Sequence, residues 1–156
     1  MNIFETFEKK LAKLDLCEFW EKNANPIGYF DVSINRRGQL ILNVSILKDA
    51  EYNGLYMHTL LDMPDDYPAS TYIGSSAAPK STVKKRNLSH IRNISGRNQC
   101  ESTAEHYKAL LKQLGKKRVR VLITAVDMSS ARSSILGLEK RMIQWFKPML
   151  NVENNR

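Results

Sequence analysis

Cysteine is scarce in this chain, and long apolar runs are missing altogether. The 156 residues include only two cysteines, Cys17 and Cys100, which show no Cys-x-x-Cys spacing. This disfavours a disulfide-stapled scaffold and a cysteine-ligated zinc site, and it favours a reducing compartment. No apolar stretch approaches the roughly 20 residues that a membrane span needs. The N-terminal segment is interrupted by acidic residues, unlike a signal peptide, so we expect a cytoplasmic protein.

Acidic residues are few in the very segment where basic residues are concentrated. The chain has 24 Lys and Arg against 16 Asp and Glu, which gives a net charge of +8. Between Lys80 and Arg120 there are twelve basic residues and two acidic ones, so this segment alone carries +10. Such a concentration of charge favours a polyanionic partner, most often nucleic acid. A basic face that serves only solubility is the alternative interpretation.

The length and the 42% apolar content predict one globular unit. Residue periodicity and turn signals predict a helix, a β-hairpin, and then a β-β-α-α-β-α series. The predicted helices cover residues 4–22, 83–94, 102–114 and 132–147, and the predicted strands cover 28–34, 39–47, 54–61, 70–74 and 118–126. We therefore expect residues 1–53 to form an extension that packs on a core of residues 54–156.

Four short motifs follow one another along this core. They are Gly54-Leu55-Tyr56 on the first strand, Tyr72-Ile73-Gly74 on the second, Arg86 and His90 one helical turn apart, and Glu139 within the late segment LEKRMIQWFKPMLN. Each motif is weak evidence alone. Together, in this order and on these elements, they resemble the GIY-YIG nuclease superfamily over residues 54–151. The pattern is most similar to that of small restriction or phage-type endonucleases.

The resemblance implies an α+β fold and a hydrolytic activity. The implied core is a small three-stranded antiparallel sheet flanked by helices, to which this chain adds an N-terminal helix and a β-hairpin. The implied activity is metal-dependent hydrolysis of DNA phosphodiester bonds, in restriction or in phage-type DNA degradation. A chain with one active site that cuts both strands favours a homodimer or homotetramer. The alternative is a non-catalytic nucleic-acid-binding module with the same fold.

The resemblance and the side-chain chemistry together suggest a role for each residue of the motifs. Glu139 is expected to bind one divalent ion, Mg²⁺ or Mn²⁺, and Arg86 to hold the scissile phosphate. Tyr56 is expected to act as the base, helped by a neighbour because a free tyrosine titrates near 10. His90 is the candidate proton partner, and Tyr72 is expected to orient the water or the phosphate.

Each of these residues also has a purely structural interpretation. Glu139 could pair with a neighbouring cation, Arg86 could be one member of a basic run, and strand tyrosines are often core residues. His58 is a rival site residue because it shares a strand face with Tyr56. His106, on the second core helix, is expected to be exposed.

The remaining candidates support or surround the site. Gly74 would permit close backbone approach, and Asn151 would tie the C-terminal tail to the site. The expected DNA-phosphate contacts are Lys80, Lys84, Lys85, Arg92 and Arg97. The Arg36-Arg37 turn could enter a groove of DNA, but an exposed turn with two arginines is as often only solvated.

Overall fold

The computed structural model describes residues 13–61, 70–95 and 101–151. The helices and strands follow one another along the chain in the order that the sequence predicts. The helices are α2 (Lys13–Asn23), α3 (Val83–Ser95), α4 (Glu101–Leu114), the 3₁₀ helix η1 (Ser129–Ser134) and α5 (Ile135–Phe146). The strands are β1 (Asn25–Ile34), β2 (Leu40–Val44), β3 (Gly54–Leu60), β4 (Ser70–Ser76) and β5 (Arg118–Asp127). The first part of the predicted helix 4–22 lies outside the described residues.

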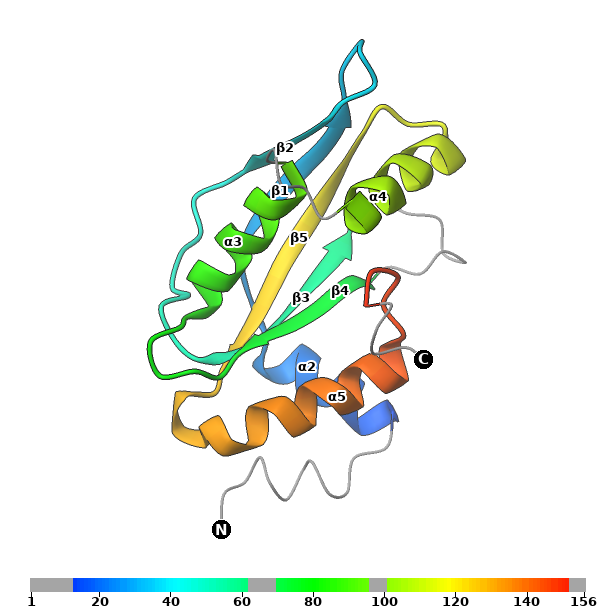
Figure 1. The fold of residues 1–156 in the computed structure, drawn as a ribbon. Coiled ribbons are helices and arrows are strands. Elements are labelled where there is room, and N and C mark those ends of the chain that lie inside the picture. The colour runs from blue at the N-terminus through cyan, green and yellow to red at the C-terminus, as the bar shows by residue number, and fades with distance from the viewer. Residues whose placement is uncertain (1–12, 62–69, 96–100, 152–156) are drawn as a thin grey trace.

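All five strands belong to one antiparallel sheet in the order β2-β1-β5-β3-β4 (Figure 1). The expected α+β class is confirmed, but the expected three-stranded sheet is wrong. The N-terminal hairpin joins the sheet because β1 pairs with β5 from Asn25 opposite Ala125 to Ser33 opposite Arg118. Without β1, β5 would be an edge strand of ten residues with one side of its backbone unpaired. Proteins usually keep such unpaired edges short or cover them.

The largest deviations from the predicted boundaries lie at element ends. Strand β2 is shorter than the predicted segment 39–47, and the predicted helix 132–147 begins as the separate 3₁₀ turn η1. Helix α5 ends at Phe146 because Lys147 adopts a left-handed conformation (φ 47°) directly before Pro148. Gly115 ends α4 in the same way, with φ 63°.

The sheet separates two hydrophobic clusters. Helices α3 and α4 cover one face, and α2 and α5 cover the other (Figure 1). Strand β3 divides its side chains between them: Tyr56 belongs to the α3/α4 cluster, whereas Leu55 and Met57 belong to the α2/α5 cluster. This alternation follows from the two-residue period of a strand. Among the described helices, none has the length and apolar character to cross a bilayer.

Candidate active site at the β4 edge

Two tyrosines on adjacent strands form the centre of the candidate site. Tyr56 on β3 lies opposite Gly74 on β4, and Tyr72 lies opposite His58. The two tyrosine rings are 6.1 Å apart, and a side-chain hydrogen bond joins them. Gly74 leaves room for this arrangement, because a Cβ atom there would overlap the phenol ring of Tyr56. The glycine therefore permits a close approach of side chain to backbone rather than an unusual φ.

Helix α3 brings a cation and an imidazole to the tyrosines. The hydroxyl of Thr82 accepts a hydrogen bond from the Lys85 N–H (3.1 Å) and so caps the first turn of the helix. One turn further on, Arg86 and His90 lie on the same side of the helix. The His90 ring stacks on Tyr72 with centroids 4.3 Å apart and planes at 20°. Arg86 is exposed, yet its charge acts on Tyr56, His90 and Glu139, so it lies close to all three.

Glu139 reaches the same edge from the opposite side of the sheet. It projects from α5, and its Oε2 accepts a hydrogen bond from the Ser75 hydroxyl on β4 (2.8 Å). Burial raises the pKa of Glu139 above the ordinary carboxyl value, while the Ser75 hydrogen bond and Arg86 act in the opposite direction. Because β4 is an edge strand, side chains from both layers of helices can meet around it.

A buried histidine lies beside this group. His58 is completely buried, and its ring centroid is 5.6 Å from Tyr56, 5.5 Å from Tyr72 and 5.6 Å from His90. Its Nε2 contacts Asn87 Oδ1 at 2.7 Å. Asn87 donates its own amide to the Val83 carbonyl (2.9 Å), which leaves Oδ1 to accept. His58 therefore carries its proton on Nε2 and presents an unprotonated Nδ1.

Burial controls the protonation of these rings. It lowers the pKa of His58 to about 3 and that of His90 to about 4, with a further decrease from His90 and Arg86 respectively. It also raises the pKa of Tyr56 well above the ordinary tyrosine value, and Tyr72 raises it further. At neutral pH both histidines are therefore neutral, and Tyr56 keeps its proton.

The C-terminal segment closes part of the β4 edge. The side chain of Asn151 accepts a hydrogen bond from the Ile73 N–H and donates one to the Ile73 carbonyl, both at 2.8 Å. The Leu150 N–H donates to the Thr71 carbonyl at 2.7 Å. These bonds satisfy backbone groups of an edge strand and position Leu150 and Asn151 beside Tyr72.

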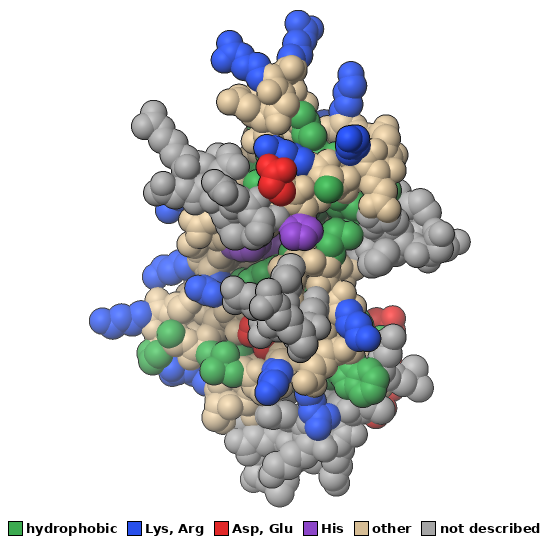
Figure 2. All heavy atoms as spheres, turned by 45° about the vertical axis from the view of Figure 1, so that its right-hand side comes forward, with side chains coloured by type: hydrophobic (Ala, Val, Ile, Leu, Met, Phe, Trp, Pro, Cys, Tyr) green, Lys and Arg blue, Asp and Glu red, His purple; other side chains and the backbone are tan. Residues whose placement is uncertain are grey.

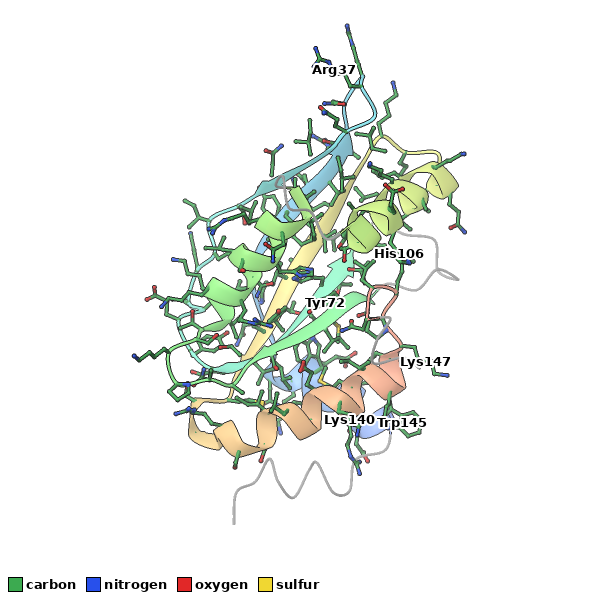
Figure 3. The ribbon with its side chains drawn as sticks, in the orientation of Figure 1. Arg37, Tyr72, His106, Lys140, Trp145 and Lys147 are labelled. Atoms are coloured by element: carbon green, nitrogen blue, oxygen red, sulfur yellow. The ribbon has the colours of Figure 1, made fainter. Side chains whose placement is uncertain are left out.

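The expected DNA-contact residues do not all lie together. Lys80, Lys85 and Arg92 are exposed around α3. Lys84 instead lines a cavity of about 490 Å³ whose wall also includes Asp49, Glu51 and Asp127. Arg97 lies outside the described residues. His106, which we expect from the sequence to be exposed, is instead partly buried on α4 (Figure 3).

The structure thus gathers Tyr56, Tyr72, Arg86, His90 and Glu139 at one edge of the sheet. Sequence reasoning gave no role to Ser75 or Asn87, because a serine or asparagine carries no spacing signal of its own. Strand alternation indicated His58 only as a rival candidate for the site, because it shares a strand face with Tyr56. No family model matches this sequence, and neither a curated protein nor a solved structure shows significant similarity to it.

The cluster suits a hard cation with few protein ligands. Within the described residues there is no group of three or more His, Cys, Asp or Glu arranged to hold a metal. Glu139 supplies one carboxylate, of which one oxygen accepts the Ser75 bond. Mg²⁺ retains most of its waters and is commonly held by one or two carboxylates together with substrate phosphates, so a single glutamate fits it.

Proposed function

We propose that this chain is a DNA endonuclease of the GIY-YIG type, which hydrolyses phosphodiester bonds in restriction or phage-type DNA degradation. The observation that carries the proposal is the meeting of five side chains from four elements at the β4 edge. Tyr56 and Tyr72 are joined by a hydrogen bond, His90 stacks on Tyr72, and Arg86 acts electrostatically on Tyr56 and Glu139. The five residues lie up to 83 positions apart in the sequence, from Tyr56 to Glu139.

Arg86 is the group suited to bind the scissile phosphate. It is exposed, so a DNA strand can reach it, and its charge acts on Tyr56, so a phosphate bound to it would lie on the same side of the sheet as that tyrosine. A guanidinium stays charged at all relevant pH values and donates two parallel hydrogen bonds to phosphate oxygens. Glu139 would hold Mg²⁺ or Mn²⁺, which supplies positive charge for the phosphorane that develops during hydrolysis.

The tyrosines and His90 would move the proton of the attacking water. The water oxygen forms a bond to phosphorus, and the bond from phosphorus to the leaving deoxyribose oxygen breaks. Tyr56 is held protonated by burial, so it can accept the water proton only while passing on its own. Tyr72 is hydrogen-bonded to Tyr56 and stacked on His90, whose imidazole is kept neutral by burial. The His90 ring would take the proton and release it to solvent, because its lowered pKa disfavours holding it. The leaving oxygen takes a proton from solvent.

The test is a supercoiled-plasmid assay with purified full-length protein, with Mg²⁺ or with a chelator. We expect metal-dependent nicking or linearisation that Glu139→Gln reduces about 10³-fold, a loss at the scale of a general acid–base or electrostatic group. Glu51→Gln, an exposed glutamate outside the cluster, is the matched control and should cut at the wild-type rate.

Cleavage by Glu139→Gln at the control rate would contradict the proposal. Salt-dependent DNA binding without cleavage in Mg²⁺ or Mn²⁺ would favour the non-catalytic binding module instead. Where cleavage occurs, the ratio of linear to nicked product, measured across protein concentrations, tests whether a homodimer or homotetramer is the active form.

A further inference from the structure

A basic groove lies at the end of the sheet that carries the β1–β2 turn, away from α5 (Figure 1). It has a volume of about 620 Å³. We call it the hairpin groove, and it is lined by Ile34, Asn35, Arg36, Leu111, Lys112, Lys116 and Lys117. One wall is the hairpin turn and the other is the end of α4 with the start of the connection to β5. A hydrogen bond from the Ile34 N–H to the Lys117 carbonyl (3.3 Å) joins the two walls.

Both walls of the hairpin groove are fixed by hydrogen bonds from backbone N–H groups. In the turn, Asn35 Oδ1 accepts hydrogen bonds from the N–H groups of Arg37 and Gln39, each at 2.9 Å. Gly38 supplies the left-handed conformation that the turn requires (φ 76°). At the other wall, the Lys116 N–H donates to the Leu111 carbonyl (3.1 Å) after the left-handed Gly115. The cations are therefore presented from an ordered frame, which limits the entropy lost on binding.

Among the residues that the structure describes, the lining of the hairpin groove includes cations and no acid. Arg36, Lys112, Lys116 and Lys117 line it, while Arg37 stands at the tip of the turn (Figure 3). Acids on neighbouring elements are already paired: Asp31 holds Arg120 through two hydrogen bonds of 2.8 and 3.1 Å, and Glu105 pairs with Lys108 at 3.4 Å. Basic side chains gather visibly at this end of the molecule (Figure 2).

The ligand that fits such a groove is a chain of regularly spaced anions. Four cations from the two walls can each neutralise a different phosphate, and each such contact releases counterions from the nucleic acid. The residues that dominate tight peptide and protein interfaces are mostly buried aromatic or Arg anchors seated in pockets. Here the only apolar lining residues are Ile34 and Leu111, and Leu111 is 1% exposed.

We infer that the hairpin groove is a second contact site for the phosphate backbone of DNA, distinct from the candidate active site at the β4 edge. The inference rests on the proposed function for the choice of DNA as the polyanion. It places Arg36, which lies far outside the basic segment Lys80 to Arg120, on the same contact surface as Lys112 and Lys117. One duplex is then held at two places on the protein.

The test measures binding in the Glu139→Gln background, where cleavage does not interfere. The probe is a labelled DNA duplex of about three helical turns, titrated at several salt concentrations. The groove variant is Arg36→Gln/Lys112→Gln/Lys117→Gln. The matched control is Lys22→Gln/Lys48→Gln/Lys140→Gln, which removes the same charge from exposed positions on other elements.

We expect the groove variant to bind at least about 10-fold more weakly, with a slope of log K against log salt that is smaller by about 3. The control should change the slope by less than about 1. Equal effects of the two variants would overturn the inference. Displacement of the duplex by polyglutamate as efficiently as by unlabelled DNA would overturn it in favour of an acidic protein partner.

Two further measurements keep the test decisive. Arg36→Gln alone, at an exposed turn position, should reduce the slope by about 1 and guards against loss of folding in the triple variant. Plasmid cleavage by the otherwise wild-type chain is followed separately. Absence of cleavage together with a groove-specific loss of binding would reject the nuclease and keep the second contact site.

Discussion

The two faces of β3 differ in chemistry although they are built from alternate residues of one strand. Leu55 and Met57 enter a cluster of apolar side chains between the sheet and helices α2 and α5. Tyr56 and His58 enter the opposite face, beneath α3, where they meet Tyr72 and His90. The α2/α5 face stabilises the fold by burial, about 1.5–3 kcal/mol for each large apolar side chain.

The α3/α4 face accepts groups that oppose folding. Among the described residues, His58 Nδ1 and His90 Nε2 are buried without a hydrogen-bond partner. An unpaired buried polar atom costs about 1–3 kcal/mol. Groups of this kind gather where a protein needs them for binding or chemistry. One strand therefore supplies apolar core residues with one set of side chains and the centre of the candidate site with the other.

The largest expected effect is a difference in plasmid-nicking rate between substitutions of two buried tyrosines on the α3/α4 side. Tyr56→Phe should reduce plasmid nicking about 10³-fold, because it removes the hydroxyl that handles the water proton. Tyr107→Phe should leave the rate within about two-fold, since its hydroxyl contacts only Thr71 Oγ1 at 3.4 Å among the interactions described. Initial rates under saturating Mg²⁺ measure both. Equal losses would mean that Tyr56 is a core aromatic.

A smaller effect is expected for charge-conserving changes along α3. Arg86→Lys keeps the charge beside the tyrosines but loses the two-pronged contact with a phosphate, so we expect cleavage to fall about 10²-fold. Arg92→Lys, an exposed position later on the same helix, should leave cleavage nearly unchanged. Single-turnover rates distinguish a slower chemical step from weaker binding. An equal response of the two variants would mean that Arg86 makes only a non-specific contact with the DNA backbone.

Between pH 7.5 and pH 5, acidification should destabilise the protein through the histidines buried on the α3/α4 face. In the unfolded chain His58 titrates at its ordinary value of 6.5, but burial lowers its pKa to about 3 in the folded state. Below pH 6.5 the unfolded state therefore binds a proton that the folded state refuses, and stability falls as pH decreases. At pH 5 the loss from His58 is about 2 kcal/mol.

Urea unfolding at pH 7.5 and pH 5 measures this loss. His58→Asn should have a smaller pH dependence than the wild type, with His90 responsible for part of what remains. Met57→Leu on the opposite face introduces no titratable group and should keep the wild-type dependence. A His58→Asn variant as sensitive to acid as the wild type would show that His58 does not titrate between the two states.

The smallest effect concerns the one hydrogen bond from β4 to Glu139. Ser75→Ala removes the 2.8 Å bond to Oε2, so the carboxylate is less well oriented. We expect the Mg²⁺ concentration for half-maximal cleavage to rise about 10-fold, the lower end for loss of a supporting hydrogen bond. Ser129→Ala is the control, because that hydroxyl bonds Asp127 instead (2.7 Å). An unchanged Mg²⁺ dependence would show that Ser75 does not position Glu139.

Local patterns in the sequence predict much of this molecule. Alternation and turn residues locate all five strands, and helical periodicity locates α3, α4 and α5 within a few residues. Spacing also places Arg86 and His90 one turn apart and Tyr56 and His58 on one face. These properties depend on neighbours along the chain, so they can be predicted before any tertiary contact is known.

Only the tertiary structure decides which distant segments meet. It pairs β1 with β5 and so extends the expected three-stranded sheet to five strands. It brings Ser75 to Glu139, turns Asn87 toward His58, and sets Arg36 beside Lys112 and Lys117. Serine, asparagine and surface lysine give no periodic or spacing signal in the sequence. Their contacts here depend on partners that are distant along the chain and that come within reach only on folding.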